Sequence, residues 1–87
     1  MYRNRQASYL VTAHQTPPAL SQIAGLLAIG GHVPVRLRSR HLGSKLMVDI
    51  DVASLSDAEA ELLATQLQRL STVLHVRLEQ VEGQRAA

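Results

Sequence analysis

The stretch KLMVDIDVASLSDAEAELLATQLQRL, residues 45–70, holds the two clearest structural patterns in the chain. In residues 45–53, apolar residues alternate with polar or charged ones, which is the period of a strand with one buried face. The residues expected on that face are Leu46, Val48, Ile50 and Val52. Further on, Ser56 is followed three positions later by Glu59, and this capping box predicts the start of a helix. The expected apolar stripe of the helix is Ala60, Leu63, Leu67 and Leu70, with Glu61, Gln68 and Arg69 facing water.

Two further segments alternate in the same way as residues 45–53. Residues 73–81, VLHVRLEQV, predict a last strand, with one face formed by Leu74, Val76 and Leu78. Residues 33–39 predict another strand, whose buried face would hold Val33, Val35 and Leu37. Turn residues follow in HLGS, residues 41–44, so this strand and the strand at 45–53 are expected to form a hairpin.

The first helix is predicted from its two ends. In QTPPALSQIAGLLAIGGHV, residues 15–33, Pro17 and Pro18 suit a first helical turn because they lack N–H groups that would have no intrahelical partner there. Gly30 and Gly31 predict its end. The expected apolar stripe between them is Leu20, Ile23, Ala24 and Leu27. A strand is expected before this helix, at about residues 8–13.

The order of elements is therefore βαββαβ, which predicts an α+β fold of the ferredoxin-like class, an antiparallel sheet with two helices on one face. With 87 residues, the chain is expected to form a single domain, 1–87, with a core from about residue 8 to residue 81 and frayed polar ends. The expected spatial order of the strands is four, one, three, two, which makes the second and fourth strands edges. Because exposed edges pair readily with other strands, we expect a homodimer.

The composition excludes several classes of function. The chain has no Cys, which excludes disulfides, thiolate metal sites and cysteine nucleophiles. No apolar run approaches the ~18 residues of a membrane span, and the N-terminal stretch lacks the pattern of a secretory signal, so we expect a cytoplasmic protein without membrane contact. No plausible base lies near Ser21, Ser54 or Ser71. No metal-ligand spacing joins the four histidines His14, His32, His41 and His75. The sequence therefore predicts neither a metal site nor an enzyme active site.

Three arginines alternate along the chain and would share one face of a strand: Arg36, Arg38 and Arg40. They could form an anion, phosphate or RNA surface, or they could belong to a solvated sheet face or an oligomer contact. The formal net charge is only +2, and the chain has no Phe, no Trp and two tyrosines. Sheets that bind RNA stack bases on several aromatic side chains, so we expect no nucleic-acid partner.

Two stretches resemble known families. The entry loop and first helix resemble the start of an ACT domain, the amino-acid-sensing form of this fold, at Ala19, Leu20, Ile23, Leu26, Leu27 and Gly31. Residues 65–81, TQLQRLSTVLHVRLEQV, resemble the small regulatory subunits of acetolactate (acetohydroxyacid) synthase, at Gln66, Leu67, Arg69, Leu70, Val73 and Val76. Within that family, the length and the short polar tail are most similar to the small subunit of isozyme II.

The resemblance implies a non-catalytic regulatory or activating subunit that docks on the large catalytic subunit of acetolactate synthase, in branched-chain amino-acid biosynthesis. The large subunit would hold thiamine diphosphate, Mg²⁺ and FAD, and this chain would bind no cofactor. The alternative is a free-standing ACT dimer that binds an amino acid and regulates another enzyme or a transcription factor.

The resemblance also implies where an effector would bind. In the family, a branched-chain amino acid lies at the dimer interface, between the loop before the first helix and the second strand of the partner. The candidate effector-binding residues are therefore Gln15, Thr16, Pro17, Pro18, Ala19 and Leu20. Amino-acid-sensitive members typically have Asn and Gly where this chain has Gln15 and Pro18, so an activating role is expected rather than valine sensing.

Overall fold

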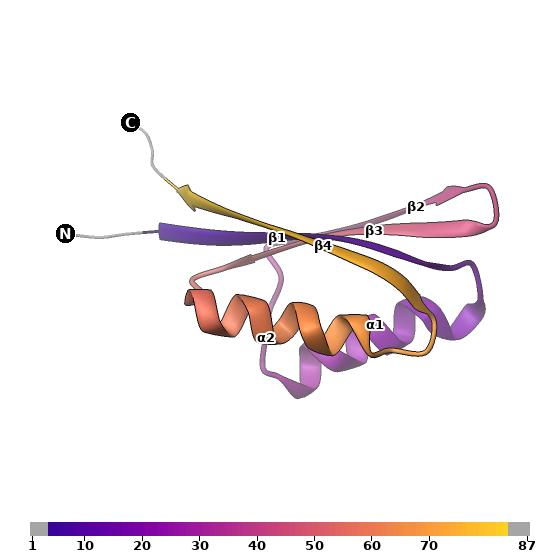
Figure 1. Cartoon of the computed structure of the whole chain (residues 1–87), viewed down its shortest axis with the longest axis horizontal. Helices are drawn as coiled ribbons and strands as arrows, with labels where there is room; N and C mark the ends of the chain where they lie inside the picture. Colours follow the sequence, from indigo (N-terminus) through magenta and orange to yellow (C-terminus); the bar gives the residue numbers. More distant parts are fainter. Residues whose placement is uncertain (1–3, 84–87) are drawn as a thin grey trace.

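In the computed structural model, which describes residues 4–83, the chain forms four strands and two helices. They follow one another as β1 (Asn4–His14), α1 (Pro17–Ile29), β2 (Arg36–Leu42), β3 (Lys45–Ala53), α2 (Asp57–Gln68) and β4 (Val73–Gly83). The strands make one antiparallel sheet in the order β2-β3-β1-β4. Both helices lie on the same side of this sheet (Figure 1), so the other side is left open. The predicted ferredoxin-like class and strand order are confirmed, with β2 and β4 as the edges.

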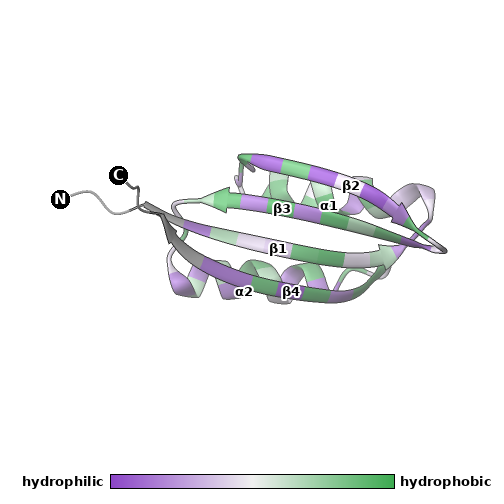
Figure 2. Ribbon diagram, turned by 90° about the horizontal axis from the view of Figure 1, so that it is seen from above, coloured by the Kyte–Doolittle hydropathy of each residue, from purple (hydrophilic) through white to green (hydrophobic). Residues whose placement is uncertain are grey.

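The core lies between the sheet and the two helices. In the view onto the open side, α1 lies behind β2 and β3, and α2 lies behind β1 and β4 (Figure 2). Alternate residues of the two central strands point into the core and are buried: Ala7, Tyr9, Val11 and Ala13 on β1, and Leu46, Val48, Ile50 and Val52 on β3. The helices contribute Ala19, Ile23, Leu27, Ala60, Leu63 and Leu67. The alternation predicted for residues 45–53 is therefore confirmed.

Tyr9 connects the sheet to α2. Its side chain is 2% exposed, and its hydroxyl donates a hydrogen bond to the carbonyl oxygen of Ala60 over 2.8 Å. A buried hydroxyl without a partner would be destabilising, so this hydrogen bond allows a tyrosine in the middle of the core. Burial raises the pKa of Tyr9 to about 12.

The start of α2 is the predicted capping box. The Ser56 Oγ accepts a hydrogen bond from the Glu59 amide over 3.1 Å, and the Glu59 carboxylate accepts one from the Ser56 amide over 2.9 Å. The hydrogen bonds from Ser56 hold the pKa of Glu59 below its ordinary value, because they favour the ionised carboxylate.

The prediction for the second strand is wrong in position and in burial. β2 covers Arg36–Leu42 and not residues 33–39, and the side chains expected in its buried face are exposed: Val33 by 82%, Val35 by 62% and Leu37 by 43%. Leu37 lies opposite Ile50 and so points to the helix side of the sheet, but α1 covers this edge of the sheet only in part. The hairpin itself is confirmed, with a turn at Gly43 and Ser44, where Gly43 has a φ of +64° that glycine adopts at little cost.

The predicted stripe of α1 is rotated about the helix axis. Ile23 and Leu27 are buried as expected, whereas Leu20 is 37% exposed and Ala24 is exposed, and Ala19 is buried in their place. Leu20 and Ala24 line hollows beside β2, so the side of α1 next to the sheet edge is only partly covered.

The ends of β1 and β4 also differ from the prediction. β1 begins at Asn4 instead of residue 8, and β4 continues to Gly83, so part of the predicted frayed tail is strand; residues 84–87 lie outside the described residues. A register shift between Thr12 and Ala13 places Val73 opposite Ala13. Val73 is therefore buried, and Leu74, which was predicted to face inward, is 42% exposed.

Tyr9→Phe keeps the ring and removes only the hydroxyl group. We expect the free energy of unfolding at neutral pH to fall by about 1–2 kcal/mol, because the buried carbonyl of Ala60 loses this donor, and urea denaturation measures this. Tyrosine ionises near pH 10 when unfolded and near pH 12 in this fold, so the wild type loses stability between these values, by up to about 3 kcal/mol. The variant has no Tyr9 hydroxyl to ionise, so its free energy of unfolding should not show this decrease between pH 10 and pH 12. An equal decrease in the two proteins would contradict the assignment to Tyr9.

Candidate functional site

The loop between β1 and α1 is fixed by backbone hydrogen bonds. The amide of His14 donates to the carbonyl of Thr72, and the amide of Gln15 donates to the carbonyl of Ser44 over 3.2 Å. Thr16 is the N-cap residue and has an extended backbone, and Pro17 follows at the first position of α1. These contacts place the loop next to the turn of the β2–β3 hairpin.

A hollow of about 350 Å³ lies between this loop and the hairpin, and we refer to it as the loop hollow. Its lining residues come from three parts of the fold: Gln15, Thr16, Pro17 and Leu20 from the loop and α1, Ser39 and His41 from β2, and Leu46 from β3. Its volume lies within the range of small-molecule sites. The structure thus brings together four of the six predicted effector residues.

The other two predicted residues do not line the loop hollow. Ala19 is fully buried in the core, and Pro18 is exposed, with its carbonyl accepting a hydrogen bond from the Ser21 hydroxyl over 3.1 Å. Three lining residues were not predicted as part of the site: Ser39, His41 and Leu46. No signal in the sequence linked the hairpin to the loop, because residues 41–44 were predicted to be a turn and the pairing of the two segments arises only in the folded chain.

The first turn of α1 offers few backbone donors to a ligand. Pro17 and Pro18 have no N–H, and the amide of Ala19 donates to the carbonyl of Thr16 over 3.1 Å. A carboxylate therefore cannot be held by the set of free amides that usually makes a helix start an anion site.

Polar side chains around the loop hollow can form the hydrogen bonds to a ligand that the backbone amides of α1 cannot. Within residues 4–83, the side chains of Gln15, Thr16, Ser39 and His41 form no hydrogen bond, and all four residues are exposed. They supply an amide, two hydroxyls and an imidazole next to the apolar surface of Leu20 and Leu46. This combination suits a small ligand that has both polar groups and a short apolar part.

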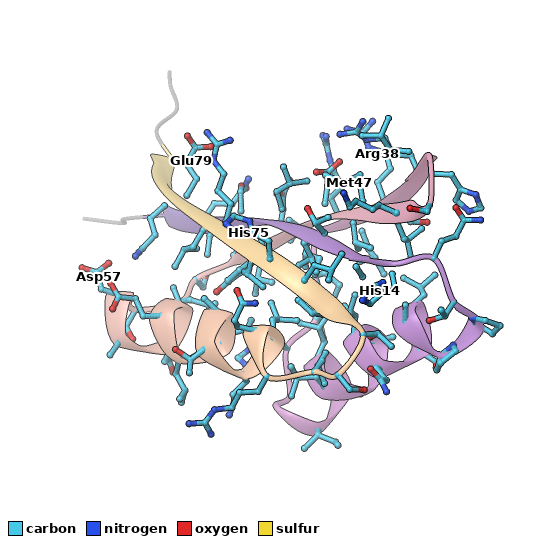
Figure 3. All side chains as sticks on the ribbon, turned by 45° about the vertical axis from the view of Figure 1, so that its right-hand side comes forward. His14, Arg38, Met47, Asp57, His75 and Glu79 are labelled. Carbon is cyan, nitrogen blue, oxygen red and sulfur yellow. The ribbon has the colours of Figure 1, made fainter. Side chains whose placement is uncertain are left out.

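The three alternating arginines share one face of β2, as predicted, and this face belongs to the open side of the sheet. Their register partners on β3 are Asp51 for Arg36, Asp49 for Arg38 and Met47 for Arg40. Figure 3 shows Arg38 and Glu79 projecting from the sheet on the side away from the helices. A hollow of about 350 Å³ lies on this face, lined mainly by three arginines and three carboxylates: Arg36, Arg38, Arg77, Asp49, Asp51 and Glu79.

This open face has the composition of a charge-balanced surface. Arg36 forms an ion pair with Asp51 over 3.7 Å. Tyr9, whose side chain is in the core, cannot stack bases here, and no other described residue is aromatic apart from the histidines.

Within residues 4–83, no group of three or more His, Asp or Glu side chains is placed to hold a metal ion. In the same part of the chain, neither helix is long and apolar enough to cross a membrane.

Comparison with protein families identifies the fold. The sequence profile of the family described as ACT-like domain matches residues 2–85 of the chain. A search of curated protein sequences found no match to the chain.

Several solved structures, two ACT domains among them, are similar to the chain at low sequence identity. The crystal structure of the ACT domain from GTP pyrophosphokinase of Chlorobium tepidum superposes with a TM-score of 0.77 at 10% identity, covering 87% of this chain and 99% of that chain. An ACT domain protein from Streptococcus pneumoniae gives a TM-score of 0.65 at 12% identity, with 90% and 89% covered. A homoserine dehydrogenase from Thiobacillus denitrificans gives 0.65 at 16% identity, with 90% of this chain and 17% of that chain covered. At these identities the likeness extends to the fold alone.

Two neighbouring apolar residues of α1 should contribute differently to stability, because Leu20 lines the loop hollow and Ile23 lies in the core. Leu20→Ala is expected to lower the free energy of unfolding by about 1 kcal/mol, because its side chain is already partly exposed. Ile23→Ala, one turn further on, is expected to cost about 2–5 kcal/mol, because it leaves a cavity in the core. Urea denaturation of the two variants compares them, and similar losses would contradict this division of α1.

Proposed function

The chain belongs to the ACT-like domain family, and from this premise we propose that it is a non-catalytic regulatory subunit that binds an amino-acid effector in the loop hollow. The observation that supports this proposal is the pairing of unbonded polar side chains with an apolar wall in one small hollow. Gln15, Thr16, Ser39 and His41 would hold the charged ends of the ligand, and Leu20 and Leu46 would contact its side chain.

The apolar wall favours a branched-chain amino acid over a charged one. No Lys, Arg, Asp or Glu lines the loop hollow, so a further charge on the ligand side chain would find no ion-pair partner, and it would face the apolar surface of Leu20 and Leu46. A branched aliphatic side chain instead gains by leaving water.

A homodimer through the β2 edge is the second part of the proposal. Beside this edge lies an apolar hollow of about 410 Å³, lined mainly by residues of α1 and of the segment before β2: Ala24, Leu27, Ala28, Gly31, His32, Val33, Pro34 and Leu37. Pairing of β2 with β2 of a second copy would satisfy edge backbone groups and cover the exposed Val33, Val35 and Leu37. The loop hollow opens along the same edge, since Ser39 and His41 belong to β2, so the partner would help to enclose the ligand.

The large catalytic subunit of acetolactate synthase is the proposed partner enzyme. The support for this part is the sequence resemblance of residues 65–81 to the small subunits of that enzyme. The large subunit would hold thiamine diphosphate, Mg²⁺ and FAD, and the small subunit would act by a coupling free energy, typically ~1–3 kcal/mol, on the active form of the enzyme. The alternative is a free-standing dimer that reports an amino acid to another enzyme or to a transcription factor.

Thermal unfolding of the purified protein with valine, leucine and isoleucine tests the effector site. A ligand that binds only the folded state raises the melting temperature by mass action, and we expect a saturable rise of roughly 5 °C or more with at least one of the three. Leu20→Glu should abolish the rise, because it places a carboxylate in the loop hollow. Leu62→Glu is the matched control, since Leu62 is an exposed leucine of α2 outside the hollow. No rise with any of the three amino acids would refute the effector site.

Reconstitution with the purified large subunit of acetolactate synthase tests the partner. If the chain is its regulatory subunit, the initial rate of acetolactate formation should rise severalfold and saturate at a fixed ratio of the two proteins. Leu62→Glu should be assayed beside the wild type, because a loss of activation with this variant would place the docking surface on the exposed side of α2. An unchanged rate together with a positive thermal shift would favour the free-standing dimer.

A further inference from the structure

The two edges of the sheet are built differently, and the difference begins at Gln68. Gln68 is the last residue of α2, and its side chain reaches the adjacent edge strand. Its Nε2 donates to the carbonyl oxygen of Leu74 over 3.3 Å, and its Oε1 accepts from the amide of Val76 over 3.0 Å. These two backbone groups belong to alternate residues of β4 and point away from β1, toward the free side of the sheet.

The amide of Gln68 stands in for a neighbouring strand at this point. A primary amide carries both a donor and an acceptor, as a peptide group does, so Gln68 occupies the backbone positions that an added strand would use. Strands at an exposed edge present unpaired backbone groups that recruit other chains, and such edges are commonly blocked in monomeric proteins.

The path of the chain makes this contact possible. After Gln68 the chain turns within four residues, where the Leu70 amide donates to the carbonyl of Leu67 and the Val73 amide donates to the carbonyl of Leu70. β4 therefore begins directly beside the end of α2. The register shift opposite Ala13 turns Leu74 outward, and this brings its carbonyl within reach of the amide.

The β2 edge has no such cover. Within residues 4–83, no side chain forms a hydrogen bond to the backbone of β2. Exposed apolar side chains lie beside it, among them Val35 and Leu37. The charges on β2 are partly compensated on the open face, where Arg36 pairs with Asp51 and Arg38 lies opposite Asp49.

We propose that Gln68 closes the β4 edge to strand pairing, so that a second copy of this chain can pair through β2 alone. The inference rests on the β2 dimer of the proposed function. Pairing of β2 with β2 is isologous and uses both open edges, whereas pairing of β4 with β2 of the next copy is heterologous and can repeat without end. By covering part of β4, Gln68 limits the assembly to two copies.

Gln68→Ala tests this inference in the full chain. Alanine is a good helix former, and Gln68 is exposed, so the variant is expected to fold, and circular dichroism checks this. Sedimentation velocity over a wide range of protein concentration should show a dimer for the wild type and larger species for the variant. At concentrations where the variant is not yet associated beyond the dimer, the Val76 amide should exchange with deuterium roughly fivefold faster than in the wild type, because it loses its acceptor.

Gln66→Ala is the matched control, because Gln66 is an exposed glutamine of the same helix whose side chain forms no hydrogen bond within the described residues. It should sediment as the wild type does. Unchanged Val76 exchange in Gln68→Ala would overturn the inference, and so would faster exchange without larger species. A monomeric wild type would contradict the β2 dimer of the proposed function, while larger species of Gln68→Ala would still support the closed β4 edge.

Discussion

The packing of α1 and α2 on the two central strands is the constraint on which the rest of the structure depends. Every inward residue of β1 from Ala7 to Ala13 and of β3 from Leu46 to Val52 is at most 7% exposed. Two fully buried alanines, Ala19 and Ala60, provide little bulk at the contacts of the helices, so the helices can approach the sheet closely. The hydroxyl of Tyr9 then anchors α2 in one position by its hydrogen bond to Ala60. Burial is concentrated on the two central strands, and the edge strands β2 and β4 are more exposed.

The candidate functional features follow from this incomplete cover. On β2 the residues that point to the helix side are Leu37, Ser39 and His41, and all three are exposed. Because the core does not use these side chains, they can vary without the loss of a packed interior, and they line hollows beside α1. A binding site next to a rigid sheet, formed by a loop and an edge strand, is a common place for a small ligand. Because its helix-side residues stay exposed, β2 contributes little to the core, and these residues remain available to contact a ligand or a partner.

The two edges of the sheet differ because the chain reaches them by different connections from the helices. At β4, the chain returns to the sheet directly after α2, and a helical side chain covers two backbone groups of the strand. At β2, six residues separate the end of α1 at Ile29 from the strand at Arg36, and this connection carries exposed apolar residues. One edge is therefore protected by its own helix, and the other presents apolar surface next to unpaired backbone. The open sheet face is different again, since it has carboxylates beside its arginines.

The patterns that the sequence determined by itself are local ones. The alternation in residues 45–53, the capping box at Ser56 and the prolines and glycines around α1 each reflect interactions between residues close in the chain, so they predicted the elements, their order and the fold class. The three arginines were placed on one face for the same reason. The entry loop was also recognised as the candidate site from the sequence, through its resemblance to ACT domains.

Only the tertiary structure decided which apolar residues are covered and which residues meet. Val33, Val35 and Leu37 alternate as a buried strand would, but alternation cannot tell an edge strand from a central one, and here all three side chains stay exposed. The bulge that buries Val73 and exposes Leu74 depends on pairing with β1, sixty residues away in the chain. The meeting of Gln15 with His41, and of Gln68 with β4, likewise requires the folded chain, because a sequence pattern reports periodicity within a segment and carries no information on distances between segments.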